Sequence, residues 1–464
     1  MTTGSTKKAT EWISSAQELD EWIEREGIRY FKIGVFDIDG VMRGKYVNRE
    51  KLRSAVDKGF GFCDVVFGWD SHDKLYERGV EVSGWHTGYR DAYVRLDLST
   101  LCRIPFEEDT LLLIGSFQGA YADVCPRTIL ARTIEKATSM GFGVDAAFEY
   151  EFFLFDETPD SVREKGYRNL DLFTPGMFGY SVIRNSVHAE FYHDLLDLME
   201  DFDCPIEALH TETGPGVIEA AIRYARGLDA ADRASIFKTF MKVFAQRADL
   251  MATFMAKWSN DYPGQSGHLH ISLCDLATGK NAFYAEGAPD DMSDTMRQFV
   301  AGQVRYMPEL LAMVCSTINA YRRLVPGMWA PTAANWGVEN RTTSVRVIPA
   351  GPNAQRSEYR VAPADANPYL AQAAALASGL RGIEEGLELS DPVTGNGYED
   401  PESLTHPLPS TLREASDRLR ASDMARSSFG DAFVDHYAGT RDWEDQENRK
   451  TVSDWDLARY FEII

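Results

Sequence analysis

The chain has 464 residues, of which 44% are hydrophobic and 26% charged, as is ordinary for a soluble globular protein of about two or three domains. Its formal net charge of −23 would repel nucleic acid and an anionic membrane surface, so neither is expected as a partner. No apolar run reaches the ~20 residues of a membrane span, and the N-terminus lacks the apolar stretch of a signal peptide. The six scattered cysteines are typical of reduced thiols, so we expect a cytoplasmic location.

The first part of the chain predicts a small mixed domain over residues 11–117, preceded by a polar, disordered tail over residues 1–10. Residues 11–26 have the apolar spacing of an amphipathic helix. Alternating and β-branched segments then predict strands over residues 30–37, 41–47 and 93–97. Asp39 and Gly40 lie between the first two strands and favour a hairpin turn.

Residues 118–464 predict a larger second domain. Pro126 suits the first turn of a helix that runs to Met140 and stops at Gly141. The longest helical pattern covers residues 229–258, with one apolar stripe that indicates a core-facing helix. Strands are expected at residues 148–155, 268–273, 344–348 and 358–361. Residues 368–464 read as largely helical, with a Pro/Gly-rich loop over 391–409.

Two pairs of carboxylates occur on expected strands. Glu149 and Glu151 alternate around Tyr150, so a strand places both acids on one face. Two acids side by side repel each other unless a positive group lies between them, although a solvated polar stripe is an equally good interpretation. Glu212 and Glu219 flank a Gly-Pro-Gly turn, which brings them back toward each other or leaves them as solvated acids of a surface hairpin.

Histidines and arginines add a second set of polar faces. His268, His270 and Ser272 share one face of a strand after a glycine-containing loop, which favours a ligand or phosphate role. Several arginines stand close together in an otherwise acidic chain: Arg322, Arg323, Arg341, Arg346, Arg356 and Arg360. They indicate a buried anion site, because guanidinium matches carboxylate and phosphate oxygens; surface salt bridges are the alternative.

These side-chain types together fit metal-assisted phosphoryl transfer. Glutamates and a histidine hold hard divalent cations through oxygen and imidazole. Cations and arginines would neutralise the phosphate oxygens of a nucleotide as charge develops.

The motifs that carry these residues resemble the glutamine synthetase family, type I, from about residue 30 to the C-terminus. In chain order they are Glu149-Tyr-Glu151-Phe-Phe-Leu-Phe, His210-Thr-Glu212-Thr-Gly-Pro-Gly-Val-Ile-Glu219, Gly267-His268-Leu-His270-Ile-Ser272, Asn319-Ala-Tyr-Arg-Arg323-Leu-Val-Pro-Gly, Asn340-Arg341-Thr-Thr-Ser-Val-Arg346, Arg356-Ser-Glu358-Tyr-Arg360 and Ala366-Asn-Pro-Tyr-Leu370.

The resemblance implies an α+β protein, with a β-grasp N-terminal domain and a catalytic domain whose curved antiparallel sheet is flanked by helices. It also implies a dodecamer of two stacked hexameric rings, with each active site between the N- and C-terminal domains of neighbouring subunits. ATP, glutamate and a small amine would be the substrates, with two or three Mg²⁺ or Mn²⁺ ions per site.

The resemblance also carries over to single residues. The set of expected metal ligands divides into Glu151, Glu212 and Glu219 for one ion and Glu149, His268 and Glu358 for the other. Gly264, Arg323 and Arg360 are the expected glutamate-binding residues. The residues expected to contact the nucleotide and its phosphates are His270, Ser272, Arg341, Arg346 and Arg356, and Arg341 is also expected to act in catalysis.

Two departures from the family pattern concern the amine. Glutamine synthetases have a glutamate that closes over the ammonium site, and Trp329 stands in its place here. The family's ammonium-site aspartate has only Asp70 as its counterpart, in Phe67-Gly-Trp-Asp70. An indole removes negative charge and adds apolar area, so the pocket favours an amine with a hydrocarbon tail. Trp69 and Trp336, in neighbouring segments, point the same way, whereas Trp329 as a mere packing residue is the alternative.

We therefore expect a γ-glutamyl–amine ligase that forms γ-glutamyl phosphate and releases ADP and phosphate, with Asp70, Arg341 and Trp329 in catalytic roles. Glutamine synthetase itself, using ammonia, is the first alternative, and a scaffold without catalysis is the second. The loop that is adenylylated in some relatives is missing, and Pro263 replaces the family's asparagine before Gly264.

Overall fold

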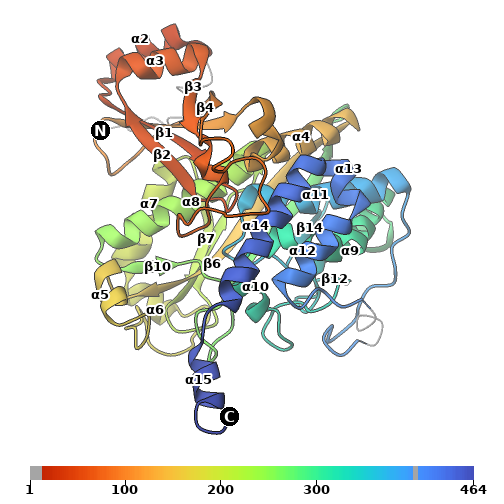
Figure 1. Ribbon diagram of the computed structural model, residues 1–464. Coiled ribbons are helices and arrows are strands. Elements are labelled where there is room, and N and C mark those ends of the chain that lie inside the picture. Colours follow the sequence, from red (N-terminus) through yellow and green to blue (C-terminus); the bar gives the residue numbers. More distant parts are fainter. Residues whose placement is uncertain (1–12, 401–405) are drawn as a thin grey trace.

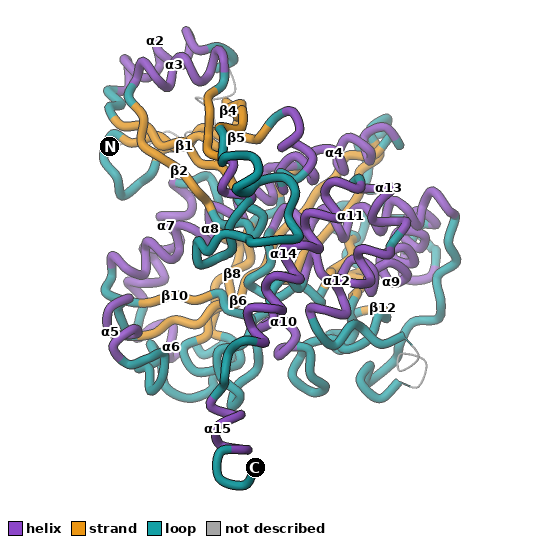
Figure 2. The backbone as a smooth tube through the Cα atoms, viewed as in Figure 1, coloured by secondary structure: helices purple, strands orange, loops and turns teal. Residues whose placement is uncertain are grey.

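The computed structural model describes residues 13–400 and 406–464, and it has an α+β architecture built on two sheets (Figure 1). The expected disordered tail over residues 1–10 and the start of the expected helix over 11–26 lie outside the described residues. A smaller sheet near the N-terminus stands at one end of a larger body, in which helices cover a second sheet (Figure 2).

The first sheet has five strands in the order β2-β1-β5-β4-β3. They are β1 (Tyr30–Phe36), β2 (Met42–Val47), β3 (Phe60–Cys63), β4 (Asp91–Arg103) and β5 (Thr110–Phe117). Strands β1 and β5 pair in parallel, and the other neighbours are antiparallel. The expected hairpin between β1 and β2 is confirmed, with Gly40 at φ +80 in the turn.

Two helices cover one face of this sheet. In α2 (Ala16–Glu26), Ser15 caps the first turn by accepting the backbone N–H of Glu18, and α3 (Arg49–Lys58) follows β2. Their buried residues pack on β1 and β5 in one hydrophobic cluster. The opposite face of the sheet packs on the larger body, where the Phe36 ring lies 4.9 Å from that of Tyr369. A mixed sheet with its helix after the first hairpin is the expected β-grasp arrangement.

The second sheet has nine strands, seven of them in the order β12-β13-β14-β11-β6-β8-β7, with β9 and β10 paired to β6. They are β6 (Phe142–Phe155), β7 (Ile206–Thr211), β8 (Val217–Ile222), β9 (Ala225–Arg226), β10 (Met251–Thr253), β11 (Gly267–Asp275), β12 (Trp336–Val338), β13 (Val345–Ile348) and β14 (Arg356–Tyr359). All pairs are antiparallel except β12 with β13.

Helices bury one face of this second sheet. The helices of the larger body are α4 (Pro126–Ser139), α5 (Pro159–Glu164), α6 (Val182–Val187), α7 (Ala189–Asp201), α8 (Leu228–Arg247), α9 (Asp294–Val314), α10 (Ile318–Arg323), α11 (Pro368–Glu385), α12 (Leu412–Ala421), α13 (Asp423–Phe429), α14 (Asp431–Arg449) and α15 (Asp454–Tyr460). On β6, Tyr150 and Phe152 point into the core, where both rings contact Phe237 of α8. The alternate residues Glu149 and Glu151 therefore lie on the opposite face.

The expected helix over residues 229–258 is wrong beyond Arg247. Asp249 adopts a left-handed conformation at φ +56, and the Leu250 N–H bonds back to the carbonyl of Ala245, which closes the helix end. Residues 251–253 then pair with β6 as strand β10. In the described residues α9, with 21 residues, is longer than α8, with 20.

The remaining expected elements are confirmed with shifted ends: the helix from Pro126 ends at Ser139, and the expected strands correspond to β6, β11, β13 and β14. The division of the chain at residue 117 stays a prediction. In the described part of the chain, no helix is long and apolar enough to cross a membrane.

Candidate active site

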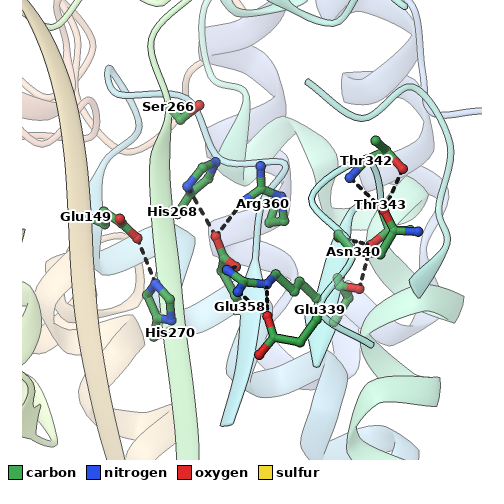
Figure 3. A network of polar contacts seen from close by, with 12 residues as sticks. Glu149, Ser266, His268, His270, Glu339, Asn340, Thr342, Thr343, Glu358 and Arg360 are labelled. Carbon is green, nitrogen blue, oxygen red and sulfur yellow. Dashed lines mark hydrogen bonds and ion pairs between the residues drawn. The ribbon is translucent and has the colours of Figure 1, made fainter. Parts of the chain in front are cut away.

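The polar face of the second sheet gathers its acids and histidines by strand register. Glu151 of β6 lies opposite Glu219 of β8, and Glu149 lies opposite His268 of β11. His270, two residues further along β11, lies opposite Glu358 of β14. One row of side chains thus crosses four neighbouring strands (Figure 3 shows its β6–β11–β14 part).

Three carboxylates form the first group that is able to hold a metal ion. Glu151, Glu212 and Glu219 each offer an oxygen, and these atoms lie within 4.8 Å of one another. Burial and the neighbouring carboxylates raise the pKa of Glu151 to about 7 and that of Glu219 to about 11. The turn between β7 and β8 brings Glu212 into place; at its Gly216 (φ +71) a side chain would meet the Leu154 carbonyl oxygen.

Glu149, His270 and Glu358 form a second such group, with His270 where the sequence predicted His268. His270 uses both ring nitrogens: Arg356 Nε donates to its Nδ1 at 3.2 Å, so its Nε2–H donates to Glu149 Oε2 at 2.9 Å. His268 is buried, its Nδ1 lies 3.3 Å from Glu358 Oε1, and its Nε2 has no hydrogen-bond partner among the described residues.

Charges around this second group keep its carboxylates ionised. Burial alone would raise the pKa of Glu358, but Arg360, 2.5 Å away, outweighs it and lowers the value to about 2. Burial opposes ionisation of Glu149 as well, and the hydrogen bond from His270 outweighs it and holds its pKa well below the ordinary range. Burial together with the charge of Arg360 lowers the pKa of His268 to about 3, which keeps its ring neutral.

The acids and histidines of these two groups are suited to bind divalent cations. His268 has a neutral imidazole whose Nδ1 lies 3.3 Å from a carboxylate oxygen and whose buried Nε2 has no partner among the described residues, which is the arrangement of a metal-binding histidine. Burial and repulsion from neighbouring carboxylates raise the pKa values of Glu151 and Glu219, and a cation between the carboxylates would offset both effects.

The acids of both groups line a cavity of about 450 Å³, and His270 does not. Besides the acids and His268, its lining includes five residues predicted from the sequence: Gly264, Trp329, Arg341, Arg346 and Arg360. Asn340 shapes the turn that carries Arg341, because its side-chain oxygen accepts hydrogen bonds from the backbone N–H and the hydroxyl of Thr342 (Figure 3). Arg346 reaches Glu358 Oε2 at 3.0 Å and pairs with Glu339.

Four further predicted residues, with His270 among them, lie beside the cavity rather than in its lining. Arg323 is 1% exposed and donates to Ser266 Oγ at 2.9 Å and to two backbone carbonyls, so it supports the loop that contains Gly264. Arg356 touches the site through His270. Ser272 follows His270 on the same face of β11 and is half-buried.

Two aromatic side chains at the cavity have left-handed backbone conformations. Trp329 is 53% exposed at φ +59, and Tyr180 is 67% exposed at φ +55. The Tyr180 ring lies 4.5 Å from that of His210, whose Nε2 is 3.1 Å from Glu219 Oε1. Tyr180 was not predicted from the sequence, because its loop has no periodic pattern; the signal present was the run of apolar residues over 177–183, which the structure shows to be exposed.

Two tryptophans do not support the expected apolar amine pocket within this chain. Trp336 is buried on β12 beside a different cavity, and its Nε1 donates to the Ser390 carbonyl. Trp69 lies in the N-terminal part under the Arg43 guanidinium, at 4.9 Å. Asp70 also lies outside the cavity lining of its own chain, with its carboxylate bonded to Trp443.

The fold and this site define an enzyme class, and the comparison with known proteins agrees. The family model described as glutamine synthetase, catalytic domain, matches residues 123–460. The chain belongs to the glutamine synthetase family of ATP-dependent carbon–nitrogen ligases.

Several relatives match nearly the whole chain. A type-1 glutamine synthetase 2 from Dictyostelium discoideum is 44% identical over 94% of this chain and 84% of its own length. A glutamate–isopropylamine ligase from a Pseudomonas species is 38% identical over 96% and 97%. A gamma-glutamylethanolamide synthetase from Streptomyces coelicolor is 35% identical over 92% and 91%.

Solved structures agree with this assignment. Ligand-free GmaS superposes with a TM-score of 0.82 at 26% identity, covering 96% of this chain and 99% of that one. The GmaS complex with ADP gives 0.83 at the same identity and coverage.

Proposed function

We propose that this protein is a γ-glutamyl–amine ligase, which joins the γ-carboxylate of glutamate to an organic amine and converts ATP to ADP and phosphate. Gly264 and Arg360 in the cavity lining, with Arg323 behind them, would hold glutamate. Guanidinium forks suit its α-carboxylate, and they place positive charge in a wall that also contains five glutamates.

The proposed metal ligands are those predicted from the sequence. Glu151, Glu212 and Glu219 would hold one Mg²⁺ or Mn²⁺, and Glu149, His268 and Glu358 another, with His268 preferred to His270 because its Nε2 has no described partner. Bound cations would supply charge neutralisation to the ATP oxygens, and the resemblance implies two or three ions per site. His270, Ser272 and Arg356 would extend the site toward the nucleotide.

In the first step, a γ-carboxylate oxygen of glutamate attacks the γ-phosphorus of ATP, giving γ-glutamyl phosphate and ADP. Arg341 and Arg346 would face the transferred group, where negative charge spreads over its oxygens. The neutral amine then attacks the acyl carbon, and phosphate leaves. Asp70, supplied by a neighbouring subunit, would accept the proton that the amine loses.

The observation that carries the preference for an organic amine is Trp329 in the cavity wall. Its indole stands where the resemblance places the ammonium-site glutamate, so the pocket loses a negative charge and gains an apolar surface. The isopropylamine ligase and the ethanolamide synthetase among the relatives support the same preference.

Two alternatives stay open to the same test. Glutamine synthetase activity with ammonia is favoured by the identity to the type-1 glutamine synthetase 2. A scaffold without catalysis is disfavoured by the converging metal-ligand groups.

The proposal requires a ring assembly, because the Asp70 of one chain does not line that chain's own cavity. Helix α15 projects away from the body with no buried residue, and Trp455 and Phe461 are exposed (Figure 1). A second copy of this chain would cover such a helix, as in the dodecamer implied by the resemblance.

All six cysteines are unpaired, in keeping with a cytoplasmic location.

The test is ADP release with ATP, Mg²⁺ and glutamate across ammonia, methylamine, ethanolamine, isopropylamine, putrescine and aniline. We expect one organic amine to exceed ammonia. Ammonia as the best acceptor would favour glutamine synthetase, and no release with any amine would favour the scaffold. Asp70→Ala should reduce the amine-dependent rate; an unchanged rate would remove Asp70 from the mechanism.

A further inference from the structure

The loop between β3 and β4, residues 64–90, lies against helix α14 of its own chain. It begins with the short helix η1 (Asp64–Phe67) and carries Asp70. In Figure 2 this loop, in teal, passes beside α14, although hundreds of residues separate the two in the sequence.

Asp70 is the centre of the contact. Its Oδ1 accepts the backbone N–H groups of His72 at 2.9 Å and Lys74 at 3.0 Å, which shapes the turn between them. Its Oδ2 accepts the indole N–H of Trp443 at 2.9 Å. An ionised carboxylate has about four acceptor positions, so three of these are used and one remains for a proton donor.

Apolar and charged contacts hold the two elements together around this bond. Trp443 is 3% exposed and packs edge-on against Tyr76 at 5.8 Å, and with Val80 they form a small hydrophobic cluster of their own. Lys74 lies 5.1 Å over the Trp443 ring and pairs with Glu447, one turn further along α14.

A glycine within α14 makes the close approach possible. A Cβ added at Gly439 would lie 1.8 Å from the carbonyl oxygen of Gly79, well inside contact distance. Glycine in a helix interior weakens the helix relative to alanine. The loop's backbone occupies the space that a side chain would need, which accounts for glycine at this position.

We propose that Trp443 is a positioning residue for the amine step, fixing the Asp70 carboxylate through its indole N–H while α14 supports the loop. The inference rests on the proposed function, in which Asp70 accepts the amine's proton. Under this inference, the C-terminal helical region of each chain fixes the position of the Asp70 that the same chain supplies to a neighbouring active site.

The test is Trp443→Phe, which keeps an aromatic ring against Tyr76 and removes the donor. Steady-state kinetics would use the best amine of the panel above. We expect KM for that amine to rise on the order of tenfold, because a hydrogen bond to a charged group is lost, with KM for ATP and glutamate within about twofold. Hydrogen exchange at the amides of His72 and Lys74 should speed up.

Gly439→Ala is the second variant, because it favours the helix and displaces only the loop. It should raise the amine KM in the same direction. Trp22→Phe is the matched control: that indole is buried without a described partner for its N–H, so the variant loses stability without changing the amine KM.

An unchanged amine KM in both Trp443→Phe and Gly439→Ala, in a wild-type protein that ligates an amine, would overturn this inference and leave the proposed function standing. Equal rises in KM for all three substrates would also overturn it, since they indicate general loosening. A wild-type protein that releases no ADP with any amine would overturn the proposed function, and this inference with it.

Discussion

At the cavity wall, Trp329 combines a half-exposed indole with a left-handed backbone that costs a non-glycine residue of the order of 1–2 kcal/mol. Such a conformation persists where neighbouring contacts fix it, and here the residue lines the same cavity as the acids. The proposed preference for an organic amine therefore depends on this single residue.

Trp329→Glu should shift the ratio of kcat/KM for ammonia to that for the best organic amine by on the order of tenfold or more toward ammonia. The carboxylate restores a charge for a small cation and removes apolar area, an effect of ~1–3 kcal/mol. The measurement is ADP release with both amines. Trp329→Phe is the control, since it keeps the apolar wall; an equal shift there would contradict the charge argument.

The carboxylates predict a pH dependence of stability in the metal-free protein. The pKa of Glu151 is raised in the folded state to about 7, from 4.5, so the folded protein binds more protons than the unfolded chain between these values. Its contribution to stability is full below about pH 4.5 and is lost as pH rises toward 7. Glu219 acts in the same direction over a wider range.

We therefore expect the Tm of metal-free protein to fall between about pH 5 and pH 7 and the fall to be smaller in Glu151→Gln. Excess Mg²⁺ should raise Tm most at the high end of this window, because the ligands must lose their protons to bind. Thermal unfolding with chelator and with Mg²⁺ measures both. An identical pH profile for Glu151→Gln would contradict the assignment.

A buried ion pair joins helices α4 and α8 and extends to strand β4 of the first sheet. Arg127 of α4 donates to Asp232 of α8 at 2.8 and 2.9 Å and to Asp97 of β4 at 2.7 Å, and the Tyr369 hydroxyl also donates to Asp232. Arg127 and Asp232 are each 5% exposed. Removing one partner would leave a charge buried without compensation.

Arg127→Met should lower the free energy of unfolding by ~3–5 kcal/mol in denaturant titrations. Arg132→Met, on the same helix, is the control: Arg132 pairs with Asp123 where both side chains are 47% exposed, so the expected loss is ~0–1 kcal/mol. Similar losses in both variants would show that burial of the first pair does not matter.

Secondary-structure elements with local signals could be predicted from the sequence. Elements whose conformation depends on pairing with a distant strand could not. Pro126, Gly40 and the alternation around Tyr150 predicted a helix start, a turn and a strand from neighbouring residues alone. The helix over residues 229–258 failed because the apolar spacing continues past Arg247, whereas pairing of residues 251–253 with β6 depends on a strand about a hundred residues earlier.

The same distinction holds at the site. Ligand types followed from motifs, but the row that faces Glu151 with Glu219 and Glu358 with His270 follows from strand register, which no local pattern gives. Tyr180 and the bond from Trp443 to Asp70 depend on loops whose paths tertiary contacts determine.

On the scale of the whole molecule, the C-terminal segment after Lys450 makes few contacts with its own chain. Its helix α15 has no buried residue, and Arg168 forms an ion pair with Asp454. Large apolar side chains without cover are typical of a surface that another subunit occupies.

Truncation after Lys450 should lower the assembled mass at least twofold in light scattering, with the fold of the remaining chain retained. A full-length variant with Trp455→Ser and Phe461→Ser keeps the segment and removes its apolar surface, and it should behave alike. A full-sized assembly in both would exclude α15 from the interface.

The row of acidic and histidine side chains across β8, β6, β11 and β14 has a consequence for errors in folding. Strand residues alternate between the two faces, so a slip of one residue on β6 would turn Glu149 and Glu151 into the core and expose Tyr150. Uncompensated carboxylates in an apolar interior make such a state far less stable than the native one. The acids of the site thus help to select the register of the sheet, because a chain with an intact core has already aligned them.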